Sequence, residues 1–238
     1  MTQKHILTDT LVGQLSYPAD ALLLRICAAL ALLGTVLLIG SNVVGSLLVE
    51  RHDWVADTVS DLAAGRLEYI QDIGLYGYAA GLLALSLALS HVRMPSHRWT
   101  IAALGLGVVA LLVTIIGARN EYGDGDSEGV EIHIYLVYAL GVAFTVVFFA
   151  AAPGLTRLRA GLGTLSYGCG VLWTIGAPIF FLLPTAYDGL WERGLGLITC
   201  VWVVAVGWAV WRLARPAKDA TIVREVVGPV RLREVPLR

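Results

Sequence analysis

Long apolar segments alternate with short polar ones along most of this chain. Six of the apolar segments are long enough to cross about 30 Å of hydrocarbon at about 1.5 Å per helical residue. The connections between them are short, so neighbouring helices are predicted to be antiparallel and to form one bundle. The fold class is therefore all-α. The predicted spans are 22–49, 69–91, 100–118, 132–152, 163–183 and 190–211.

Composition decides between a soluble and a membrane bundle. Hydrophobic residues make up 57% of the chain and charged residues 15%, and the mean hydropathy is +0.74. Soluble domains ordinarily carry about a quarter of charged residues. Here the charges gather between the apolar segments, which lack the polar face that a soluble helix keeps toward water. These features exclude a soluble helical protein and indicate an integral membrane protein.

Both ends of the chain are polar. The first apolar segment is too long for the hydrophobic region of a signal peptide, so it is predicted to remain as the first span. The chain is thus predicted to comprise an N-terminal segment (1–20), a six-span transmembrane domain (21–212) and a basic tail (213–238). The tail is predicted to be disordered or to lie on anionic lipid headgroups.

Charged residues are distributed unevenly across the predicted membrane. Six spans put both termini on one side, and thirteen of the 17 lysine and arginine residues lie on that side. Because basic loops stay in the cytoplasm, the termini are predicted to be cytoplasmic and the protein to be a multi-pass protein of the cell membrane. Thirteen of the 18 acidic residues lie on the opposite, outer side. Membrane lipids, a partner membrane protein or a second copy of the chain are the expected partners, and nucleic acid is not.

One stretch of the first outer loop is dense in polar side chains. Asp57, Ser60 and Asp61 lie within five residues, and if residues 55–64 are helical, the two aspartates share a face. The predicted topology brings polar residues from the outer ends of the other spans beside this stretch. The predicted ligand-binding residues are Asn42, Asp57, Arg119, Asn120, Tyr187, Asp188, Glu192 and Arg193.

Two interpretations of these outer polar groups remain open. Asp72 and His133 lie just inside predicted spans, where ionisable groups usually face the bundle interior. In one interpretation, three arginines neutralise three carboxylates in a structural network. In the other, which we prefer, a non-enzymatic membrane protein of uncharacterised activity has an outer-face pocket for a lipid headgroup, a small ligand or a partner membrane protein. The six residues of the network are Arg66, Arg119, Arg193, Asp61, Asp72 and Glu192.

The alternative function is a membrane-embedded lipid hydrolase. Ser60, Asp61 and His133 supply the residue types of a nucleophilic triad, with Asp72 as a further catalytic candidate, although no nucleophile-elbow motif surrounds the serine. Such a site needs these groups within about 8 Å of one another. His52 and His133 are too few for zinc, whereas the carboxylates suit a hard cation. The sequence assigns no metal ligand and no cofactor, and it is compatible with an enzyme and with a non-enzyme.

Several short motifs resemble those of a known family. The segment 60–63 after the first span, the glycine-rich second span, the histidine that opens the fourth span and the segment 188–194 resemble the DUF998 family. Its members are prokaryotic proteins of similar size with six or so spans and unknown function, and the resemblance covers residues 20–212. The chain is loosely similar to the Frag1/DRAM-like six-span proteins. It is more distantly similar to the ceramidase and progestin-receptor-like membrane hydrolases, but it lacks the paired histidines at the end of their last span.

Overall fold

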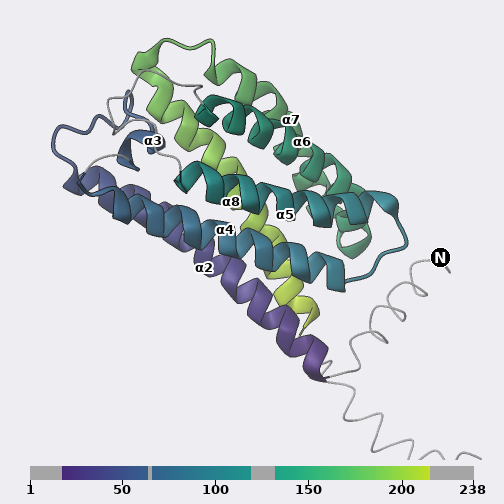
Figure 1. Ribbon diagram of the computed structural model, residues 1–238. Coiled ribbons are helices and arrows are strands. Elements are labelled where there is room, and N and C mark those ends of the chain that lie inside the picture. The colour runs from purple at the N-terminus through teal and green to yellow at the C-terminus, as the bar shows by residue number, and fades with distance from the viewer. Residues whose placement is uncertain (1–17, 64–65, 119–131, 215–238) are drawn as a thin grey trace, which may run out of the picture.

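The described part of the chain is helical almost throughout. A computed structural model describes residues 18–63, 66–118 and 132–214 of the 238 residues, and these residues contain no strand (Figure 1). The all-α fold class is therefore confirmed. The long helices are α2 (Pro18–Leu48), α4 (Glu68–His91), α5 (His97–Ala118), α6 (Ile132–Leu158), α7 (Ala160–Phe180) and α8 (Asp188–Leu213). The short elements are α3 (Val59–Leu62) and the 3-10 helix η1 (Thr185–Tyr187).

The helices begin and end within a few residues of the predicted spans, except at the end of α6. This helix continues through Pro153 to Leu158, where the sequence predicts a loop that begins at the proline. The loop prediction is wrong because packing outweighs the local signal. Gly154 lies so close to the ring of Trp99 that a side chain on Gly154 would overlap it. The last turns of α6 therefore pack against α5 even though proline removes one helical hydrogen bond.

The helices are long and apolar enough for a membrane protein. Within the described residues, five of them meet the length and composition needed to cross a bilayer: α2, α4, α5, α6 and α8, the last counted from Thr185. Helix α7 has 21 residues, but its many glycine, serine and threonine residues lower its hydropathy. The prediction of a multi-pass membrane protein is thus supported by five spans, and the sixth stays a prediction. The predicted N-terminal segment and basic tail lie almost wholly outside the described residues.

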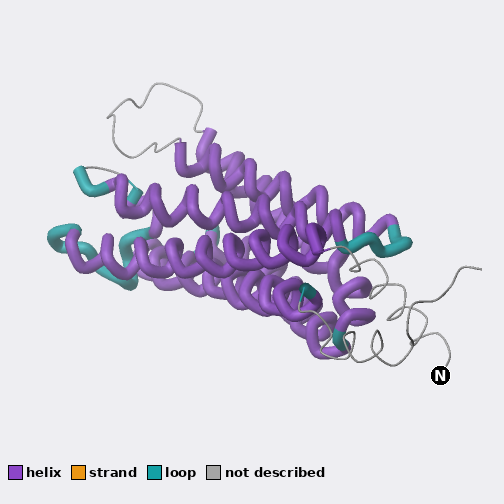
Figure 2. Tube along the Cα trace, turned by 90° about the horizontal axis from the view of Figure 1, so that it is seen from below, coloured by secondary structure: helices purple, strands orange, loops and turns teal. Residues whose placement is uncertain are grey.

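The six long helices form a closed ring. Each packs mainly against the helices before and after it in the chain, and α8 packs back against α2. Figures 1 and 2 show the helices side by side along one common direction, with α3 at one end and the start of α2 at the other. We call the end that holds α3 and η1 the α3 end. It is the end that the sequence predicts to face outside.

Helices α2 and α4 approach each other most closely. A side chain on Gly34 of α2 would overlap the carbonyl of Gly77 in α4, and one on Gly81 would lie 2.9 Å from the carbonyl oxygen of Leu30. The sequence shows Gly77 and Gly81 as a small-xxx-small pair, which is typical of close helix contacts in membranes. The structure confirms that both glycines lie in this contact.

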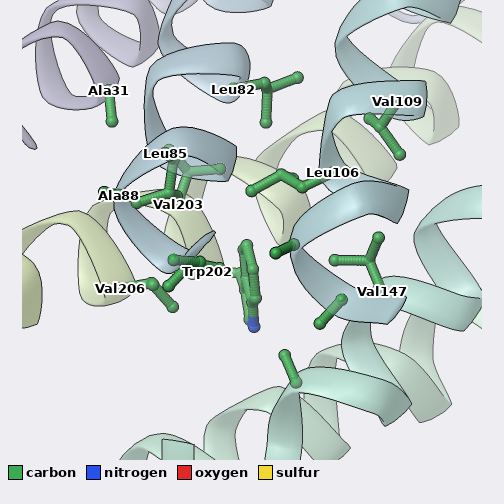
Figure 3. Packing of buried hydrophobic residues seen from close by; sticks show 14 of the residues in the cluster. Ala31, Leu82, Leu85, Ala88, Leu106, Val109, Val147, Trp202, Val203 and Val206 are labelled. Atoms are coloured by element: carbon green, nitrogen blue, oxygen red, sulfur yellow. The ribbon is translucent and has the colours of Figure 1, made fainter. Parts of the chain in front are cut away.

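Trp202 of α8 fills the centre of the bundle away from the α3 end. Its side chain is fully buried, and its indole Nε1 donates to the hydroxyl of Ser166 at 2.9 Å. That hydroxyl donates in turn to the carbonyl oxygen of Phe148 at 2.8 Å. Figure 3 shows Trp202 among apolar side chains that include Leu85 and Leu106. We call this part of the bundle the packed half, because large side chains fill it.

Candidate functional site

The outer loop, residues 51–63, folds tightly on itself at the α3 end. The backbone N–H of Asp57 donates to the carbonyl of Asp53 at 2.8 Å, and the N–H of Asp53 donates to Asp57 Oδ2 at 2.7 Å. Thr58 then caps α3 in a capping box with Asp61. Asp61 Oδ2 accepts from the N–H of Thr58 at 2.6 Å and from its hydroxyl at 2.8 Å. The carboxylates of both aspartates therefore bind the loop itself.

The outer loop is attached to the first turn of α8. The N–H groups of Gly189 and Leu190 donate to the carbonyls of Ala56 and Val55 at 3.1 and 3.0 Å. A side chain on Gly189 would overlap the carbonyl of Asp57, so only glycine permits this approach. The first N–H groups of a helix have no partner within the helix. The loop carbonyls satisfy two of them here.

Arg193 of α8 is the main side-chain link between the loop and the bundle. Its Nε donates to Asn42 Oδ1 at 3.1 Å, and its Nη1 donates to the carbonyls of Trp54 and Asp57 at 3.2 and 2.7 Å. Its Nη2 lies 2.8 Å from His52 Nε2, and the guanidinium lies 4.8 Å from the centre of the Trp54 ring. One side chain thus joins α2, α8 and the outer loop.

His52 is held in one protonation state by this contact. A guanidinium can only donate, so Nε2 of His52 must accept and the imidazole is neutral, with its proton on Nδ1. Nδ1 lies 3.4 Å from Asp57 Oδ2, and the side chain is 2% exposed. Burial lowers the pKa of His52, and the Arg193 charge lowers it further, against the opposing influence of Asp57, Asp61 and Asp53. Protonation would place two cations against each other.

A cavity of about 1630 Å³ lies inside the ring at the α3 end. All six long helices, α3 and the outer loop contribute to its wall. In its depth, the hydroxyl of Tyr78 donates to Thr199 at 2.9 Å, and Nε1 of Trp173 donates to the carbonyl of Gly141 at 2.9 Å. These contacts leave the floor apolar and aromatic. We call this part of the bundle the hollow half.

The polar rim of the cavity is formed where α8 meets the outer loop. Glu192 Oε2 accepts from the N–H of Val59 at 2.7 Å, and Asp188 lies one helical turn earlier on α8. Both acidic residues line the cavity. Asp188 Oδ1 and Asn42 Nδ2 are buried atoms that have no hydrogen-bond partner. The rim thus combines satisfied backbone groups with acidic side chains.

The cavity gathers about half of the residues predicted from the sequence. Asp57 and Asp61 serve the outer loop, Asp72 lies on α4 away from the cavity wall, and Tyr187 is half-exposed in η1. Arg119 and Asn120 lie outside the described residues. The predicted residues that line the cavity are Asn42, Ser60, His133, Asp188, Glu192 and Arg193.

Sequence reasoning gave too little weight to His52 and Trp54. Both lie in the short outer loop, and both contact the guanidinium of Arg193. A tryptophan and a histidine close together in a short loop that is otherwise charged, small or aliphatic were the available signal. Their partner, Arg193, lies about 140 residues away on α8, so the sequence offered no way to pair them.

The candidate catalytic residues are only partly brought together. No group of three or more histidine, cysteine, aspartate or glutamate side chains in the described ranges could hold a metal ion. Ser60 and His133 line the same cavity, but the carboxylate of Asp61 is used in the capping box. Within the predicted arginine–carboxylate network, the described hydrogen-bond partners of Arg193 are an amide, two carbonyls and an imidazole. The part of that network that involves Arg119 lies outside the described residues and stays a prediction.

Comparison with known proteins yields one match. A family model described as "Protein of unknown function (DUF998)" matches residues 28–209. Searches of curated proteins and of solved structures return no match. The looser similarities to the Frag1/DRAM-like proteins and to the ceramidase-like hydrolases remain predictions.

Proposed function

Because the chain belongs to the DUF998 family, whose function is unknown, we propose its function from the geometry of the cavity. The protein is an integral membrane protein that binds an amphiphile in the hollow half. The apolar part of the ligand lies against the floor, and its polar part lies at the rim near Glu192 and Asp188. The observation that carries this proposal is the cavity itself, which joins an aromatic floor to a polar rim inside one ring of helices.

The proposed topology has six spans with cytoplasmic termini. Helix α7 packs between α6 and α8 and has 21 residues, which supports its inclusion as the sixth span. The excess of basic residues on the side of the termini supports a cytoplasmic location for them. In this orientation the α3 end lies at the outer surface of the cell membrane, and the rim lies near the level of the outer lipid headgroups.

The size of the cavity favours a lipid-like ligand. Drug-sized molecules occupy pockets of about 300–1,000 Å³, and this cavity, at about 1630 Å³, is larger. Most of its lining residues are apolar, including Leu38, Val113 and Leu195. A long apolar chain bound in the cavity would cover this apolar surface. Each methylene group buried in this way contributes about 0.8 kcal/mol to the free energy of binding.

The hydrolase alternative has weaker support. It requires Ser60, Asp61, Asp72 and His133 to act together, and neither of the two aspartates is among the residues that line the cavity. No observation on the described residues supplies a base held against the Ser60 hydroxyl. Binding without chemistry uses the same cavity and requires none of these contacts.

Two glycines of α8 provide a matched test. Gly196 lines the cavity, and a side chain on it would meet no atom within 4 Å at its Cβ. Gly194 also has open space around it but is exposed and does not line the cavity. Gly196 lies one turn below Glu192 and one turn above Cys200, so Gly196→Trp places a large ring across the cavity. Either substitution replaces a poor helix former and should leave folding intact.

The measurement is the amphiphile that co-purifies with each variant, determined by mass spectrometry on protein in mild detergent. We expect Gly196→Trp to lower its amount about tenfold or more by steric exclusion, and Gly194→Trp to leave it unchanged. Equal amounts in both variants and in the unmodified protein would show that the cavity holds no ligand.

A further inference from the structure

Apart from the neutral amide donor Asn42 Nδ2, which has no partner, the rim of the cavity has few hydrogen-bond donors left for an anionic ligand. Arginine carries five N–H donors, and four of those on Arg193 go to Asn42, Trp54, Asp57 and His52. A phosphate or carboxylate headgroup would have to compete with each of these contacts. The strongest cation at the rim is therefore already engaged by the protein.

The first turn of α8 is likewise occupied. The N-terminus of a helix is ordinarily a ready site for anions, because its first N–H groups are free. Here Gly189 and Leu190 donate to loop carbonyls. The N–H of Val59, at the start of α3, donates to Glu192. The backbone donors at this part of the rim thus point at protein acceptors.

Acceptors, by contrast, remain available on the same face. Asp188 and Glu192 are spaced i, i+4 on α8, and both line the cavity. Glu192 uses Oε2 for the outer loop, and Asp188 Oδ1 is buried without a hydrogen-bond donor. A buried carboxylate oxygen without a donor is costly, and a cationic or N–H-bearing ligand would relieve that cost.

Aromatic rings line the same cavity as these acceptors. Trp54, Tyr138 and Phe181 line the cavity, and the rings of the last two lie 4.5 Å apart. Aromatic faces attract cations when they are shielded from water. Trp54 already demonstrates this at the rim, since the Arg193 guanidinium lies 4.8 Å from its ring centre.

The excess of acidic residues at the predicted outer side also favours a cationic ligand. The predicted outer side of the chain, counted over the joining segments and the adjacent ends of the helices, carries thirteen acidic and four basic residues. A surface of one predominant sign raises the local concentration of oppositely charged ligands. Cations are therefore favoured on approach as well as at the rim.

We propose that the amphiphile bound in the cavity carries a cationic amine at its polar end, held by the carboxylates of Asp188 and Glu192 and by the neighbouring aromatic rings. This proposal rests on the proposed function and adds the chemical class of the ligand. It excludes a headgroup recognised through its phosphate alone.

The test compares three probes that share one alkyl chain and differ in the head: a primary amine, a phosphate and an alcohol. Binding to the purified full-length protein in a neutral detergent is measured by competition with a brominated alkyl amine that quenches tryptophan fluorescence. We expect the amine to bind about tenfold more tightly than the phosphate, because the carboxylates of the rim attract an ammonium group and repel a phosphate. The variants are Asp188→Asn and Glu192→Gln, which keep side-chain shape. Glu68→Gln is the control, because Glu68 is exposed at the same end and does not line the cavity.

The outcomes separate this inference from the proposed function. Loss of the amine preference in Asp188→Asn or Glu192→Gln, with the Glu68→Gln control unchanged, supports it. If the phosphate or the alcohol binds as tightly as the amine and Gly196→Trp abolishes binding, the amine assignment is wrong and the cavity still binds amphiphiles. If none of the probes binds and Gly196→Trp changes nothing, both proposals fail. Melting temperatures of all variants confirm that each is folded.

Discussion

The packed half and the hollow half belong to one ring of helices but are filled very differently. Near the centre of the packed half, Trp202, Phe148 and Leu106 are fully buried. In the hollow half, small residues such as Gly196 and Thr145 line the cavity, and the Thr145 hydroxyl donates to a carbonyl of its own helix at 3.0 Å. The two halves therefore differ in side-chain size at the ring axis.

This difference predicts which half of the bundle loses more stability when side-chain atoms are removed. A close-packed interior loses free energy with every atom removed, whereas a cavity wall has no partner atoms on one side to lose. The stability of the hollow half depends instead on the hydrogen bonds that attach the outer loop to α8. Each of the following predictions tests this contrast, from the largest effect to the smallest.

Truncation of one tryptophan in each half should give the largest difference between the two halves in the free energy of unfolding. Trp202→Ala removes a ring at the centre of the packed half, and we expect a loss of about 3–5 kcal/mol in the free energy of unfolding. Trp173→Ala removes a buried ring at the cavity wall, where the space left behind adjoins the existing cavity, and we expect a smaller loss. Thermal or denaturant unfolding in detergent measures both. Equal losses would mean that the cavity is filled or collapsed in the folded protein.

Gly189→Ala should detach the outer loop. The added methyl group would overlap the carbonyl of Asp57, and overpacking of this kind costs about 3 kcal/mol at its upper end. Hydrogen exchange should show faster exchange in residues 51–63 and unchanged protection around Trp202. Gly194→Ala is the matched control, since open space surrounds that position and alanine there should stabilise α8 by up to about 1 kcal/mol. A global loss of protection in Gly189→Ala would contradict the independence of the two halves.

Arg193→Lys should weaken the same attachment while it keeps the charge. A lysine ammonium cannot reproduce a planar guanidinium that bonds Asn42, two carbonyls and His52 at once, so we expect a local loss of about 2 kcal/mol from the hydrogen bonds given up. The readout is again hydrogen exchange in the outer loop. Arg98→Lys, at an exposed position on α5, should change stability by no more than about 0.5 kcal/mol. If hydrogen exchange in the outer loop were unchanged in Arg193→Lys, the positive charge alone would be enough to hold the loop on α8.

Acidification should give the smallest effect, again confined to the hollow half. The pKa of His52 in the folded protein lies below its ordinary value of 6.5, so the unfolded loop binds the proton more readily. The contribution of neutral His52 is therefore complete above about pH 6.5 and is lost as the pH falls from there through the lowered pKa. The protection factors in residues 51–63, which correct for the intrinsic pH dependence of amide exchange, should fall over that window, and those around Trp202 should stay unchanged.

His52→Gln tests the same point without a titrating group. Glutamine keeps an acceptor that the guanidinium of Arg193 can use, so the loss of protection at low pH should disappear in this variant. A loss of protection at low pH that persists in His52→Gln would contradict the assignment of the effect to His52.

Much of the candidate site could be predicted because the membrane orders the chain along one direction. Once the spans were identified from their apolar length, the outer ends of α2, α6 and α8 had to meet, and Asn42, His133 and Glu192 do line one cavity. The roles of Asp57 and Asp61 could not be predicted, because both satisfy backbone groups within the loop. Competition between local and distant partners is decided by geometry that a sequence pattern does not contain.

The sequence by itself determined the all-α membrane class, the positions of the long helices and the uneven distribution of charged residues between the two predicted sides of the membrane. These follow from hydropathy and charge, which each residue contributes wherever it is placed. Only the tertiary structure decided that α8 closes the ring against α2, that α6 runs on past Pro153, and that Arg193 joins His52, Trp54 and Asn42. The cavity also belongs to this second group, because its volume depends on side-chain sizes at positions that six separate helices bring together.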